Sequence, residues 1–127
     1  MSLRTPLGRV LGLGSAKEGV SHWWVQRVTS AALIPLTLWF VFALLGLPDL
    51  DYLTVRSWMG GGWTPVFLLL LVVTACYHSW LGLQVVFEDY VHTKAIKVAA
   101  LFGSTFLHAI VAVASVFAVL KIAFQGA

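Results

Sequence analysis

The chain has 127 residues, of which 60% are hydrophobic and only 10% are charged, and its formal net charge is +3. In soluble domains about a quarter of the residues are charged, so an ordinary soluble domain is excluded. The modest positive charge lies beside apolar segments, which favours a role in membrane topology over nucleic-acid binding. The single cysteine, Cys76, excludes an intrachain disulfide and any cysteine cluster for an iron–sulfur centre or structural zinc within this chain.

Residues 1–27 form a basic segment with a single acid. Its apolar core, VLGLG, is too short for a secretory signal. We therefore expect this segment to be retained as a polar arm on the inner side of a membrane, with Trp23 and Trp24 in the interfacial belt.

Three long uncharged runs follow, at residues 28–47, 65–87 and 98–120. About 20 apolar residues are needed to cross the ~30 Å of hydrocarbon in a bilayer, and a helix is the only open segment that satisfies its own backbone there. The sequence therefore predicts an all-α membrane protein in which residues 28–127 form a three-helix membrane anchor.

The connections between the runs give an orientation. Proline, aspartates and a triple glycine indicate that the first connection is a loop, and the second, EDYVHTKAIK, is short. The side with the N-terminal arm and the second connection holds six Lys and Arg residues, whereas the other side holds only Arg56 and Lys121. The positive-inside rule therefore predicts an inside N-terminus and an outside C-terminus. No internal repeat is visible, which argues against an inverted-repeat transporter.

The stretch TACYHSWLGLQVVFEDY, from Thr74 to Tyr90, carries most of the polar chemistry. At about 100° per residue in a helix, His78 and Asp89 fall near one stripe and lie about 16 Å apart along the axis. An imidazole in hydrocarbon is costly unless it is paired. His78 is therefore either a packing histidine bonded to a neighbouring helix or an axial haem ligand, and the residues alone leave both interpretations open.

Four further residues have a structural and a functional interpretation. His108 lies at a depth matching that of His78, so it is either a second haem ligand within the chain or a packing histidine. Arg27 either extends to the headgroups or binds an anion such as a haem propionate. Asp89 and Tyr90 either end a helix among headgroups or form a quinone site, in which the phenol donates to a carbonyl and the carboxylate assists protons.

Two motifs resemble one family. HSWLGLQVVFEDYV, from His78 to Val91, resembles the signature of the small hydrophobic membrane anchor of succinate dehydrogenase, respiratory complex II. GVSHWWVQRVT, from Gly19 to Thr29, is similar to the same family's entry to its first helix. The three-span plan also agrees, so the resemblance covers nearly the whole chain.

The resemblance implies a complex with several subunits. An anchor of this family packs with a second three-helix anchor subunit, and together they hold a flavoprotein and an iron–sulfur subunit against the bilayer. FAD and the iron–sulfur clusters lie only in those partners, where succinate is oxidised, and ubiquinone is the substrate reduced at the membrane junction. The chain would then be a non-flavin subunit that does not oxidise succinate alone. It would be a multi-pass protein of the bacterial inner (cytoplasmic) membrane rather than the mitochondrial one.

The resemblance also implies roles for four residues, none of them catalytic by itself. His78 is similar in position to the axial iron ligand of a haem b that is shared with the second anchor subunit. Arg27 matches an arginine near the haem propionates and the quinone pocket. Tyr90 resembles a tyrosine that bonds a quinone carbonyl, and Asp89 resembles the neighbour of that tyrosine in the proton path.

Three other functions stay open. The first is a fumarate reductase anchor, which runs the related chemistry in reverse. The second is a stand-alone haem protein that uses His78 and His108 as its two ligands. The third is a structural subunit or transporter without a cofactor.

Overall fold

The computed structural model describes residues 17–125, which contain four helices and no strand. In chain order the helices are α2 (Lys17–Leu45), α3 (Tyr52–Gly60), α4 (Thr64–Tyr90) and α5 (Lys94–Gln125). Three of them are long and apolar enough to cross a membrane. The all-α, three-span prediction is therefore confirmed, while the first part of the predicted arm lies outside the described residues.

α4 and α5 extend beyond their uncharged runs at both ends, whereas α2 begins eleven residues before its run and ends two residues before the run does. With 29, 27 and 32 residues, they are about 40 to 48 Å long at ~1.5 Å per residue, whereas the hydrocarbon core is ~30 Å thick. Their ends therefore reach the headgroup regions. Residues 17–27, which the sequence assigned to the arm, are helical and continuous with the first span. Counting uncharged residues finds the hydrocarbon part of a helix and misses the polar turns beyond it.

The connection that was predicted to be a loop contains the short helix α3. Asp51 stands at its N-cap in extended backbone, and its N–H donates to the Asp49 side chain at 3.2 Å. Hydrogen bonds from Thr54 and from that N–H lower the pKa of Asp49 below its ordinary value. Three glycines follow, and Gly62 has a φ of 52°, which favours glycine.

Aromatic packing stabilises α3 against the ends of its longer neighbours. The Trp58 ring lies 6.1 Å from the rings of both Trp39 and Phe40, and Trp39 lies 4.9 Å from Phe67. A nine-residue helix is marginal by itself, so α3 depends on these tertiary contacts. Its own sequence, flanked by helix breakers, predicted a loop because it does not reveal such contacts.

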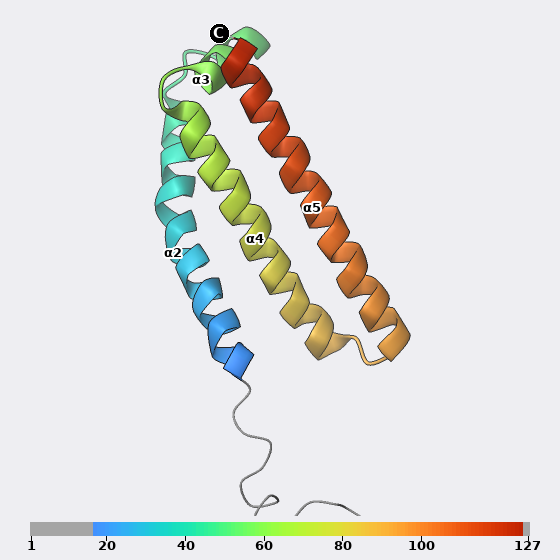
Figure 1. Cartoon of the computed structure of the whole chain (residues 1–127). Coiled ribbons are helices and arrows are strands. Elements are labelled where there is room, and N and C mark those ends of the chain that lie inside the picture. The colour runs from blue at the N-terminus through green and yellow to red at the C-terminus, as the bar shows by residue number, and fades with distance from the viewer. Residues whose placement is uncertain (1–16, 126–127) are drawn as a thin grey trace, which may run out of the picture.

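The three long helices form an open row with α4 in the middle (Figure 1). α4 packs against α2 on one side and α5 on the other, and in residues 17–125 no contact joins α2 to α5. Few side chains are buried in the described part of the chain, namely Pro65, Leu68, Leu81, Ser104 and Val119. The row therefore has no closed core of its own, and most large apolar side chains face outward, where lipid or other chains can cover them.

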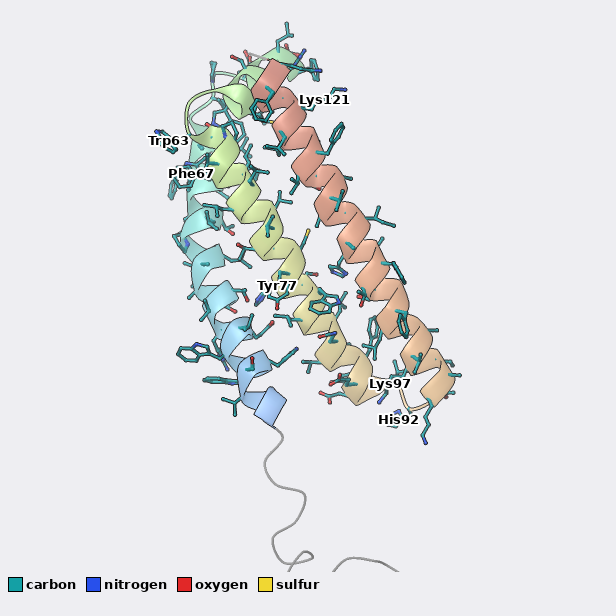
Figure 2. The ribbon with its side chains drawn as sticks, in the orientation of Figure 1. Trp63, Phe67, Tyr77, His92, Lys97 and Lys121 are labelled. Atoms are coloured by element: carbon teal, nitrogen blue, oxygen red, sulfur yellow. The ribbon has the colours of Figure 1, made fainter. Side chains whose placement is uncertain are left out.

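The two ends of the row carry different labelled residues. Figure 2 shows His92 and Lys97 at one end and Trp63 and Lys121 at the other. We call the first the inner end, following the predicted orientation. There the Lys97 ammonium donates to the Glu88 carbonyl at 2.8 Å, which satisfies one of the free carbonyls in the last turn of α4.

Candidate functional site

His78 lies at the interface between α4 and α2, where its Nδ1 is 2.9 Å from the Thr29 hydroxyl oxygen. Thr29 is twelve residues from the start of α2 at Lys17, and His78 is twelve residues from the end of α4 at Tyr90. Because the two helices run in opposite directions, both residues lie about 18 Å from the inner end. The early start of α2 is what brings them to the same level.

The second nitrogen of His78 is open. Nε2 has no hydrogen-bond partner among the described residues, and the only buried side-chain N or O atom there without a partner is Gln26 Oε1. The Nε2 atom is therefore not sealed inside the row. Its surface is at least partly accessible, as an axial ligand requires.

His108 has the opposite environment. Its Nδ1 donates to the Ser104 carbonyl at 2.8 Å, and its Nε2 lies 3.1 Å from the Ser79 hydroxyl of α4. The predicted match in depth is present, because Ser79 is the neighbour of His78. However, His78 contacts α2 and His108 contacts α4, so the two rings lie in different interfaces. These bonds are the ones expected of a packing histidine, and the geometry argues against an iron site made by both histidines.

An apolar groove runs between α4 and α5 beside His108. Its volume is about 290 Å³, and its walls include Cys76, Tyr77 and Ala112. Across the groove, α4 and α5 are joined by a hydrogen bond from the Trp80 indole N–H to the Thr105 hydroxyl at 3.0 Å. The polar groups at this interface bond to one another, which leaves an apolar surface for lipid chains or another helix rather than for a polar substrate.

α2 and α4 are in contact at Gly82. A Cβ placed on Gly82 would lie 3.7 Å from the Gln26 side-chain nitrogen, which is an ordinary van der Waals distance. Gln26 therefore packs against the bare backbone of α4, one helical turn from His78 on the inner side.

Substitutions at Gly82 are expected to separate by size. Gly82→Ala should leave assembly unchanged, because its methyl group fits against Gln26. Gly82→Leu should push α2 from α4 and destabilise the chain by about 1–3 kcal/mol, the usual cost of overpacking. The yield of assembled complex in mild detergent measures both effects, and Gly103→Leu, which has open space around it, is the matched control. Equal yields for both leucine variants would contradict the close α2–α4 contact.

The other predicted site residues fall into two groups along the row. Arg27 is exposed, with its guanidinium 5.4 Å from the centre of the Trp23 ring. It is two residues from Thr29, so it lies near the His78 level and about 15 Å from that of Tyr90. The sequence placed Arg27 at the inner end of the first span, but α2 continues for another ten residues beyond it.

Asp89 and Tyr90 are the last two residues of α4, and both are exposed at the inner end. The structure therefore places Arg27 at nearly the level of His78 and separates both from Asp89 and Tyr90 along the row. The separation of about 16 Å between His78 and Asp89 along α4 agrees with the helical prediction, because α4 is continuous between them.

Thr29 and Gln26 were not identified from the sequence. A threonine hydroxyl inside an apolar run is a weak signal, because it usually bonds its own helix backbone. The pairing of Thr29 with His78 depends on where α2 begins. The sequence predicted a first span that begins at residue 28, which would place Thr29 at the end of the helix instead of twelve residues inside it.

Comparisons with known proteins agree on one family. The model of the succinate dehydrogenase/fumarate reductase transmembrane subunit matches residues 1–120. The succinate dehydrogenase hydrophobic membrane anchor subunit of Rickettsia bellii is 32% identical over 94 residues, which are 74% of this chain and 75% of that one. The subunit of the same name from Paracoccus denitrificans is 29% identical over 110 residues, 87% of this chain and 85% of that one. The one from Rickettsia conorii is 38% identical over 79 residues, 61% and 63% of the two chains.

Proposed function

The chain belongs to the succinate dehydrogenase/fumarate reductase transmembrane subunit family, and we propose that it anchors a succinate:ubiquinone oxidoreductase and supplies one axial ligand of a haem b. Its relatives bear the name of succinate dehydrogenase anchor subunits, which favours the succinate enzyme over fumarate reductase. The observation that carries the haem assignment is the open Nε2 of His78, combined with the bonded Nδ1.

The donor set fits a haem held between this chain and another. Metal-binding histidines normally donate their second ring N–H to a protein group, and His78 has such a partner in Thr29. Among the described side chains, those of residues 20–125, no three His, Cys, Asp or Glu side chains come together, and both nitrogens of His108 are engaged. The second axial ligand is therefore assigned to the second anchor subunit. When bound, the haem supplies a one-electron redox centre inside the membrane.

Arg27 lies at a suitable level for an anionic edge of that haem. Its guanidinium is exposed and contacts only an aromatic ring among the interactions found in the described residues. A guanidinium presents several N–H donors to a carboxylate, so Arg27 is proposed to bind a propionate. Its distance from the level of Tyr90 makes a shared quinone contact within this chain a weaker assignment.

Tyr90 and Asp89 are proposed to contribute to ubiquinone reduction at the inner end. Succinate loses two electrons and two protons in the flavoprotein, and ubiquinone gains two of each. The Tyr90 phenol can donate a hydrogen bond to a quinone carbonyl as negative charge develops on its oxygen. Asp89 can carry protons from the inner aqueous side. Both side chains are exposed, so the rest of the pocket is assigned to the partner subunits.

Loss of this chain is expected to release the soluble subunits from the bacterial inner membrane. In a deletion strain, succinate oxidation measured with a soluble dye should move to the soluble fraction, and succinate-dependent quinone reduction in membranes should fall to background. The reason is that the flavoprotein and iron–sulfur subunits lack spans of their own in this proposal. Re-expression of the full chain is the control, and quinone reduction persisting in deletion membranes would contradict the function.

A further inference from the structure

We propose that Thr29 is the positioning residue of His78, because its hydroxyl accepts the Nδ1 proton of the imidazole and so keeps Nε2 unprotonated for the iron. This inference rests on the proposed function, in which His78 binds haem. It assigns a role to α2, the helix that does not itself carry the ligand.

The single hydroxyl proton of Thr29 has three possible acceptors. Its Oγ1 lies 2.8 Å from the Val25 carbonyl oxygen, 3.1 Å from the Gln26 carbonyl oxygen and 2.9 Å from His78 Nδ1. Carbonyl oxygens only accept hydrogen bonds, whereas a hydroxyl has one proton to donate and lone pairs with which to accept. Donation to Val25 or Gln26 leaves the lone pairs of Oγ1 directed to His78.

The two neutral tautomers of His78 differ in the hydrogen bonds that they can make. With the proton on Nδ1, Thr29 makes two hydrogen bonds and Nε2 presents a lone pair. With the proton on Nε2, Thr29 must give its only proton to Nδ1, and the Nε2–H has no acceptor among the described residues. Leaving a donor without an acceptor in an apolar surrounding is unfavourable. The first tautomer is therefore favoured, and it is the one that can bind iron through Nε2.

Thr29 is a rigid acceptor. Thr29 is β-branched, which restricts its side-chain torsion, and its bond to the preceding turn of α2 fixes the hydroxyl further. The hydroxyl thus connects a rigid helix to the imidazole across the α2–α4 interface. Partners of this kind orient a ligand and raise its basicity, and their loss typically weakens metal binding about 10- to 100-fold.

The test compares Thr29→Val with two controls in the purified complex. Thr29→Val keeps the shape of the side chain and removes the hydroxyl. Thr29→Ser keeps the hydroxyl. Ser30→Ala removes a neighbouring hydroxyl whose hydrogen bond goes to the Gln26 carbonyl at 2.9 Å and not to His78. Haem retention is measured by transfer to excess apomyoglobin, and the haem midpoint potential by optical redox titration.

We expect Thr29→Val to retain haem about 10- to 100-fold more weakly and to shift the midpoint potential upward, because a less basic imidazole stabilises the ferric state less. Thr29→Ser and Ser30→Ala should keep the wild-type values. If haem retention and the haem midpoint potential are the same in Thr29→Val as in Ser30→Ala, the proposed role of Thr29 is wrong. If Thr29→Val does not assemble, Thr29→Cys replaces it beside Thr29→Ser, since the thiol is a much weaker acceptor, and equal retention in that pair overturns the role as well.

His78→Ala in the same set separates the two hypotheses. Haem lost in His78→Ala but unaffected in Thr29→Val means that the ligand is right and only the role of Thr29 is wrong. Haem retained in His78→Ala means that the proposed ligand itself is wrong.

Discussion

Replacing His78 with alanine is expected to remove the b-type haem signal from the complex while the succinate-oxidising subunits stay attached. The ligand is lost because no other histidine in residues 17–125 has a free ring nitrogen at this level: His108 at the matching depth is bonded through both nitrogens. The measurement is a reduced-minus-oxidised optical spectrum of the purified complex, normalised to its flavin content.

His108→Ala is the matched control for that experiment. It removes an imidazole from the same depth of the row. Its loss costs the bond to the Ser104 carbonyl within α5 and the bond to Ser79 of α4, of which the second, between helices, is worth about 0.6–2 kcal/mol in a membrane protein. We expect some loss of stability in detergent with the haem spectrum unchanged. A haem signal that survives His78→Ala and disappears in His108→Ala would exchange the roles of the two histidines.

Tyr90→Phe is expected to slow ubiquinone reduction about 100-fold, the usual effect of removing a hydrogen-bond donor from an oxygen that becomes negative in the reaction. Succinate oxidation with a soluble dye should be unchanged, because that chemistry takes place in the flavoprotein. Steady-state assays with both acceptors measure the two rates separately. The haem spectrum should also stay, since Tyr90 lies about 18 Å from the level of His78 along α4.

Tyr77→Phe is the control for a lost phenol on the same helix. Tyr77 is partly exposed and lines the apolar groove between α4 and α5, so its hydroxyl is far from the inner end (Figure 2). Equal quinone-reduction rates in the Tyr90→Phe and wild-type complexes would remove Tyr90 from the quinone site, whatever the spectrum shows.

The helices were predictable from the sequence because hydrophobicity over about 20 residues is a direct physical requirement of a span. Their ends were less predictable, because charged and polar residues such as Lys17 and Glu18 continue α2 in the headgroup region at little cost. The helix α3 was missed for a different reason. It is stabilised by Trp58 against aromatic residues of other helices, and such contacts are not visible in a local pattern.

The candidate site was predictable along one helix but not between helices. The shared stripe and spacing of His78 and Asp89 follow from the helical period alone, and α4 is continuous between them. By contrast, the sequence could not distinguish His78 from His108, because the difference lies in their partners on other helices. Thr29 was not identified for the same reason: its pairing depends on the register of α2 against α4.

Chemical rescue is the most direct test of iron ligation by His78. The complex with His78→Gly is prepared, and its reduced-minus-oxidised spectrum is recorded before and after haem reconstitution with added imidazole. We predict no b-type signal without imidazole and a restored signal with it, because the free ligand occupies the space that the side chain has left. A full b-type signal in His78→Gly without imidazole would show that another group binds the iron and would contradict the assignment.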